Sequence, residues 1–197
     1  MRSFFTTPRD TQTGLKLLHR NLYTAGHDAS IPDRACRACS EKETQLHLCE
    51  CDIIYREYWE ALIQLAVDTG MTPPARVTAF IATGALSTTE AIPATHAGIW
   101  FLGWRCLYAE LVRSRIDNTP PDLERALKRA VGMIIGRLRA YGSRWRLWVE
   151  TGRYLTPPRA IPRKHHNKGV LTSDAQGNYT IHDAIWQLAQ SLGIPTR

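Results

Sequence analysis

The chain has 197 residues, 44% of them apolar, and a formal net charge of +7. This apolar content can fill the core of one ordinary domain, or of a small module plus a larger one, and excludes wholesale disorder. The charge is uneven, because residues 105–168 carry 15 Lys and Arg against 5 Asp and Glu. Such asymmetry favours a polyanionic partner, most often nucleic acid, although basic proteins without one are common.

Membrane insertion and secretion are not expected from this sequence. No apolar run approaches the roughly 18 residues of a membrane span, since "AGIWFLGW" is followed directly by Arg105. The first residues, "MRSFFTTPRD", lack the apolar region of a secretory signal. Four of the five cysteines crowd into residues 36–51, whereas a secreted disulfide scaffold would spread them. We therefore expect an intracellular, reducing compartment, with nucleus and organelle both open.

Hydrophobic periodicity predicts about six helices in chain order. The first is a short amphipathic helix over 13–26, which Gly26 ends. A second runs from about Asp52 to Thr69 and stops at Gly70. A shorter helix is expected over 75–83, and a mostly buried one over 96–116, before Pro120.

The segment from Asp122 to Glu150 has the strongest helical periodicity. Its apolar stripe comprises Leu123, Leu127, Ala130, Ile134, Leu138, Tyr141, Trp145 and Trp148. The opposite face is basic and comprises Arg125, Lys128, Arg129, Arg139 and Arg146. The aromatic residues suit core packing more than base stacking, which leaves the basic side chains for phosphates. Gly132 and Gly136 on the basic side either allow close approach of a partner or are simply tolerated.

The C-terminal quarter begins with a basic, proline-containing linker over 156–169. Its Arg163, Lys164 and Lys168 are further candidates for phosphate contact, and its adjacent histidines suit a solvated loop more than a metal site. A β-hairpin around a Gly-Asn turn and an amphipathic helix complete residues 170–197. The predicted fold is mainly α: a zinc-knuckle module (10–70), a basic helical region (71–155), the linker, and the hairpin with its helix.

The stretch "CRACSEKETQLHLCEC" offers five metal-binding side chains for a four-coordinate ion. Cys36 and Cys39 have the spacing of a zinc knuckle. If a helix starts with Thr44 as its N-cap, His47 and Cys51 are neighbours on one face, because they are four residues apart. The predicted ligands are therefore Cys36, Cys39, His47 and Cys51, a set that suits structural Zn²⁺.

The remaining two cysteines have other interpretations. Cys49 would point away from His47, either as a small core residue or as a substitute ligand if the helix frays. Cys106 lies among aromatic residues and suits core packing. The competing interpretation of the whole cluster is a set of ordinary buried thiols beside a surface histidine.

Residues 15–62 resemble the zinc-binding domain that follows the polymerase domain of non-LTR retrotransposon reverse transcriptases. The matching residues are Leu18, His19, Cys36, Cys39, Glu43, Thr44, His47, Leu48, Cys51 and Trp59. The spacing from His to Cys is x3 here and often x4 in that family. The resemblance implies zinc and contact with RNA or DNA, in a detached or domesticated tail of a retroelement protein.

Catalysis is not expected, because we find no polymerase Tyr-x-Asp-Asp motif, RNase H carboxylate cluster or catalytic triad in the sequence. We therefore expect a non-catalytic, zinc-containing nucleic-acid-binding protein, with RNA as the first candidate ligand. The alternative is a structural subunit of a large assembly, such as an organellar ribosome, in which zinc serves folding only. A nonfunctional retroelement remnant is a third possibility.

Overall fold

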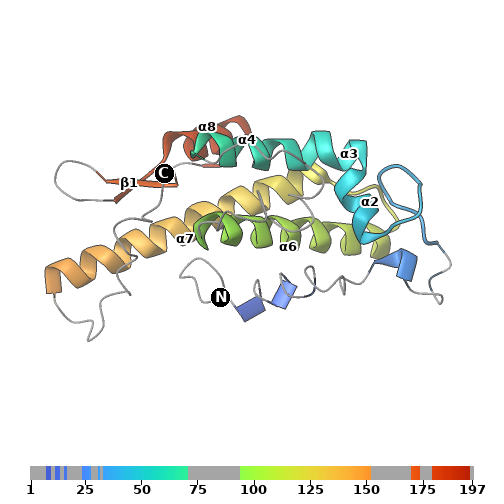
Figure 1. Ribbon diagram of the computed structural model, residues 1–197, viewed down its shortest axis with the longest axis horizontal. Coiled ribbons are helices and arrows are strands. Elements are labelled where there is room, and N and C mark those ends of the chain that lie inside the picture. Colours follow the sequence, from blue (N-terminus) through green and yellow to red (C-terminus); the bar gives the residue numbers. More distant parts are fainter. Residues whose placement is uncertain are drawn as a thin grey trace, which may run out of the picture.

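A computed structural model of the chain confirms the mainly α fold. The structure describes residues 33–70, 94–151, 170–173 and 179–195, with positions 8–9, 12–13, 16, 24–27 and 31 before them. The helices are α2 (Gln45–Glu50), α3 (Asp52–Ile54), the π-helical turn η2 (Tyr55–Trp59), α4 (Glu60–Asp68), α6 (Ala94–Ile116), α7 (Leu123–Thr151) and α8 (Asp183–Ser191). Helices α6 and α7 lie side by side along the long axis, and α4 and α8 cover one side of them (Figure 1).

The helix predicted over 52–69 exists as α3, η2 and α4 in direct succession. Its end is as expected, because Gly70 takes the left-handed φ of 92° that favours glycine. The π-helical turn was not predicted. Both Tyr58 and Trp59 of that turn are fully buried, so it directs two consecutive aromatic rings into the core.

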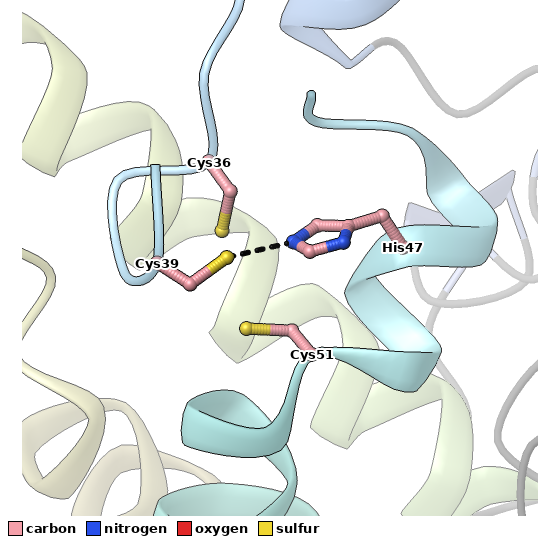
Figure 2. Close-up of side chains that lie close together, drawn as sticks. All are labelled: Cys36, Cys39, His47 and Cys51. Carbon is pink, nitrogen blue, oxygen red and sulfur yellow. Dashed lines mark hydrogen bonds between the residues drawn. The ribbon is translucent and has the colours of Figure 1, made fainter. Parts of the chain in front are cut away.

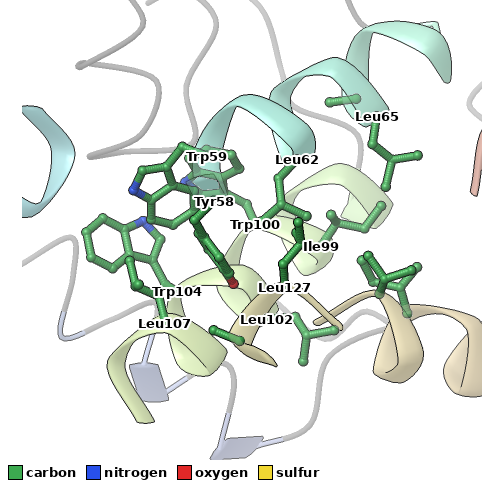
Figure 3. Close-up of a cluster of buried hydrophobic side chains, with 14 of the residues drawn as sticks. Tyr58, Trp59, Leu62, Leu65, Ile99, Trp100, Leu102, Trp104, Leu107 and Leu127 are labelled. Carbon is green, nitrogen blue, oxygen red and sulfur yellow. The ribbon is translucent and has the colours of Figure 1, made fainter. Parts of the chain in front are cut away.

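Trp59 lies in an aromatic cluster at the centre of the core (Figure 3). Its indole ring stacks on Trp100 of α6, with ring centroids 4.9 Å apart, and lies equally close to Trp104. The Trp59 Nε1–H donates a hydrogen bond to the carbonyl oxygen of Leu48 (3.2 Å), which belongs to α2. The same core cluster includes Cys36 and Cys51, so the cysteine-rich segment and the helical body share one core.

Helix α7 matches its predicted stripe as far as the side chains are described. Leu123, Leu127, Ala130, Ile134 and Leu138 are all buried, and Ala126, Val131 and Ile135 widen the buried face. Asp122 caps the helix instead of starting its first turn, since its Oδ1 accepts the N–H of Arg125 at 2.8 Å. Side chains of residues 141–151, including the predicted Tyr141, Trp145 and Trp148, lie outside the described part.

Two short strands precede the last helix. Strands β1 (Leu171–Ser173) and β2 (Tyr179–Ile181) pair antiparallel, with Thr172 opposite Thr180. Residues 174–178, on which the predicted turn of the hairpin depends, lie outside the described residues. Helix α8 follows as predicted, and the side chain of His182 caps it by accepting the N–H of Ala184. Most of the helix predicted over 13–26, the helix over 75–83 and the linker over 156–169 also lie outside the described residues.

The helices found in the described ranges give no membrane-spanning candidate, because none of them is both long enough and apolar enough.

Two helical glycines should respond in opposite ways to alanine. A Cβ at Gly136 of α7 would meet nothing within 4 Å, which favours the interpretation that this glycine is simply tolerated. Gly136→Ala is therefore expected to raise the free energy of unfolding by about 1 kcal/mol through helix propensity. A Cβ at Gly103 of α6 would lie 2.9 Å from Leu62 Cδ1, so Gly103→Ala is expected to lower stability. Urea unfolding of both variants checks this, and equal signs would contradict it.

Candidate metal centre and basic surface

A tight loop brings Cys36 and Cys39 together. Ala35 and Lys42 form an antiparallel bridge at its base, and the N–H of Cys36 donates to the carbonyl of Glu41. The loop reverses direction at Ser40, whose φ of 69° is left-handed. The N–H of Ser40 donates to the carbonyl of Cys36 at 2.8 Å. The loop therefore places both thiols on one side, as the knuckle spacing predicts.

Helix α2 and its C-cap residue, Cys51, supply the other two predicted ligands. Thr44 is its N-cap, and the Thr44 hydroxyl accepts the N–H of His47 at 3.0 Å. The N–H of Cys51 donates to the carbonyl of His47 at 2.7 Å, which is the hydrogen bond of one helical turn. His47 and Cys51 consequently lie on one face, and the predicted helix start is confirmed.

The four predicted side chains converge on one point (Figure 2). The ligand atoms of Cys36, Cys39, His47 and Cys51 all lie within 4.8 Å of one another. The Cys39 Sγ is 3.1 Å from the His47 Nε2. Ligands of a tetrahedral zinc ion with Zn–S distances of about 2.3 Å are separated by about 3.8 Å, so small adjustments would bring this group onto an ion. These four residues could hold a metal ion.

Cys49 takes no part in this group. It is buried on the core side of α2, and its thiol donates to the carbonyl of Gln45 at 3.2 Å. Burial raises the pKa of Cys49 to about 12, so its thiol stays protonated at neutral pH. Of its two predicted roles, the structure favours the small core residue.

Burial also shapes the chemistry of the candidate ligand thiols. Desolvation raises the pKa of Cys36 to about 12, and it raises the pKa of Cys51. Thiolates without a cation are therefore disfavoured at this point of the fold. A bound divalent ion reverses this preference, because it binds the thiolate and releases the proton.

A carboxylate also contacts the site, and it was not predicted from the sequence. Glu41 Oε2 lies 3.3 Å from the Nδ1 of His47, on the side of the ring away from the thiols. Histidine ligands of metals commonly make such a contact, which leaves the other ring nitrogen to bind the ion. The position of Glu41 in the loop was visible in the sequence, but its contact depends on how the loop folds back.

The predicted basic residues whose side chains the structure describes divide into two groups. Arg125 contacts the buried carboxylate of Glu110, and Lys128 pairs with Glu124 at 2.7 Å. Arg129 and Arg139 are exposed, and the guanidinium of Arg139 lies over the ring of Trp186, 5.1 Å from its centroid. The side chain of Arg146, together with Arg163, Lys164 and Lys168, lies outside the described residues. The structure thus places no continuous row of unpaired basic side chains on the described part of α7.

The ion pair of Glu110 should make stability depend on pH. Burial opposes ionisation of Glu110, but hydrogen bonds from the Arg125 side chain and the Asp122 N–H outweigh it and hold its pKa below the usual range. The stabilisation is therefore complete above about pH 4.3 and is lost as pH falls toward the lower pKa of the folded state. We expect Glu110→Gln to be less stable at neutral pH, with the difference from wild type shrinking below pH 4. Urea unfolding from pH 7 to 3 measures it, and a constant difference would contradict the assignment.

Comparisons of the chain with known protein families, with curated proteins and with solved structures gave no match. We therefore infer the function from the geometry of the site and the distribution of charge.

Proposed function

We propose that this chain is a non-catalytic zinc protein that binds nucleic acid, RNA in the first place, and that it derives from the tail of a retroelement reverse transcriptase. Three thiols and an imidazole in tetrahedral reach of one another suit Zn²⁺ better than the oxygen-preferring cations. Four protein ligands would leave no open coordination position for a substrate. The proposed role of zinc is therefore structural, and the origin rests on the resemblance of residues 15–62 alone.

The observation that carries the nucleic-acid proposal is a separation of charge along the helices. Acidic residues gather at the junction of α6 and α7, where their carboxylates lie close to basic side chains: Glu110 to Arg125, Asp117 to Arg113, and Glu124 to Lys128. From Arg129 to Lys168 the sequence has ten basic residues and one acidic residue, Glu150. The C-terminal turns of α7, in this basic stretch, extend beyond α6 (Figure 1). The excess of basic over acidic residues along this stretch of the sequence suits a phosphate backbone.

A salt titration tests this proposal. The zinc-loaded protein should bind single-stranded and double-stranded RNA with an affinity that falls steeply as salt rises. Replacing Arg129 and Arg139 together by glutamine should reduce the slope of log K against log salt by about 1.5. Arg113→Gln is the matched control, because Arg113 lies at the acidic junction, 3.2 Å from Asp117. The absence of binding at low salt, or the same slope in the double variant and the control, would contradict the proposal.

One observation favours the second candidate, a subunit of a larger assembly. Val112 and Ile116 lie four residues apart on α6, and Ile116 is 77% exposed. On α2, Leu46 is 57% exposed. Exposed apolar side chains of this size can contact a partner protein, although isolated ones are common on protein surfaces. Purification from the native source distinguishes the two functions. A stoichiometric complex that Ile116→Glu disrupts supports the subunit, whereas a monomer that binds RNA supports the first proposal.

A further inference from the structure

Arg115, near the end of α6, contacts both of the segments that carry the metal ligands. Its Nη2 donates to the carbonyl oxygen of Ala35 at 3.3 Å and to Oε2 of Glu43 at 2.9 Å. Its Nη1 lies 3.3 Å from the other oxygen of Glu43. Ala35 directly precedes Cys36, and Glu43 directly precedes the Thr44 that caps α2. One guanidinium thus joins the loop to the start of the helix.

The contacts of Glu43 show that this connection is buried. Its side chain is only 3% exposed, and it also accepts the N–H of Ala25 at 3.0 Å. The Glu43 N–H donates to the carbonyl of Arg34, which closes the base of the same loop. A buried carboxylate is costly without a cationic partner, so Glu43 and Arg115 depend on each other. The planar guanidinium can donate to two acceptors at once, which an ammonium group on a flexible stem does less well.

We propose that Arg115, acting with Glu43, is a positioning residue of the metal centre. It holds the loop of Cys36 and Cys39 against the helix face of His47 and Cys51, at the separation that one ion requires. This inference rests on the proposed zinc site and adds to it a residue far away in the sequence that sets its affinity. Neither Arg115 nor Glu43 belongs to the group of ligands.

The thermodynamic consequence is a dependence of zinc affinity on Arg115. Without metal, the loop and α2 can exchange between the arrangement that binds the ion and arrangements that do not. Arg115 favours the arrangement that binds the ion, because in that arrangement its guanidinium reaches Ala35 and Glu43 together. The apparent affinity for an ion falls as the fraction of protein in the binding arrangement falls. Removing the Arg115 side chain therefore weakens zinc binding, even though all four coordinating residues remain.

Competition titration with a zinc chelator of known affinity tests the inference on the full chain. Arg115→Met is expected to weaken zinc binding about tenfold or more, which is within the usual range of coupling between sites. Arg115→Lys keeps the charge but not the bidentate geometry, so a smaller loss of several-fold is expected. Arg113→Met is the control, because Arg113 lies on the same helix in an exposed ion pair with Asp117.

A spectroscopic readout separates positioning from other causes. The charge-transfer absorption of bound Co²⁺ should be the same in wild type and in both Arg115 variants, since the thiolates are unchanged. If Arg115→Met does not fold, Arg115→Lys carries the test. If Arg115→Lys binds zinc as tightly as the wild type, and Arg115→Met does so too where it folds, the inference is overturned while the zinc site stands. A wild-type chain that binds no zinc would instead overturn the proposed site, and the positioning role of Arg115 with it.

Discussion

Cys51→Ser is expected to abolish stoichiometric zinc binding, whereas Cys49→Ser is expected to retain one ion per chain. The two thiols are two residues apart, but only Cys51 belongs to the group whose ligand atoms lie within 4.8 Å of one another. A serine hydroxyl is a poor zinc ligand at neutral pH, because zinc prefers thiolate and imidazole. At position 49 the hydroxyl can still donate to the carbonyl of Gln45, which the thiol contacts at 3.2 Å.

The loss of the ion should also be visible in stability. Zinc binding contributes folding free energy, because the unfolded chain has no preformed site. We expect Cys51→Ser to lower the free energy of unfolding by at least about 3 kcal/mol and to make unfolding insensitive to a chelator. Cys49→Ser should cost about 1 kcal/mol and keep the response to chelator. Metal analysis and thermal unfolding with and without chelator measure both effects. A chain that keeps zinc without the Cys51 thiol but loses it without the Cys49 thiol would refute the assignment.

The convergence of the four candidate ligands was predictable because local rules determine it. The spacing of Cys36 and Cys39 describes a short loop, and the cap at Thr44 fixes the phase of the helix that follows. Once that phase is known, His47 and Cys51 must share a face, and Cys49 must point elsewhere. The apolar stripe of α7 was predictable for the same reason, since side chains at helical spacing face one direction.

Contacts between distant segments were not predictable from one sequence. Arg115 and Glu43 are 72 residues apart, and nothing near either residue indicates the other. Arg125 was predicted to contact phosphate, but its guanidinium contacts Glu110, 15 residues earlier on another helix. Its neighbour Lys128 pairs with Glu124 across one helical turn, a spacing that the sequence already showed. Among the described residues of α7, the proposed contact with phosphate therefore rests more on Arg129 and Arg139 than the sequence indicated.

The π-helical turn η2 has a similar cause. A regular α-helix through 55–59 has no sequence signal against it, so the extra residue in that turn reflects packing. Tyr58 and Trp59 follow each other directly, yet both are fully buried, and the Tyr58 hydroxyl donates to the carbonyl of Gly103 at 2.6 Å. The partner helix α6 thus supplies the contacts that accompany the unusual turn.

Trp59→Ala is expected to be the most destabilising single core substitution, with a loss of about 4 kcal/mol. The indole is fully buried, stacks on Trp100 and lies at a tilt against Trp104. Its Nε1–H donates to the carbonyl oxygen of Leu48, on the helix that carries His47. Truncation to alanine would leave a cavity between α6 and the π-helical turn, and the carbonyl of Leu48 would lose its donor. Urea unfolding measured with zinc in excess gives the value without a contribution from metal release.

Two matched variants separate the causes of this loss. Trp59→Phe keeps an aromatic ring in the cluster but removes the N–H donor, so it should cost less, about 2 kcal/mol. Trp186→Ala removes the same side chain from a half-buried position on α8 and should cost less than Trp59→Ala. If Trp59→Ala and Trp186→Ala proved equally mild, the aromatic cluster would not be the centre of the core. A phenylalanine variant as unstable as the alanine variant would instead show that the hydrogen bond to Leu48, and with it the attachment of α2, outweighs the stacking.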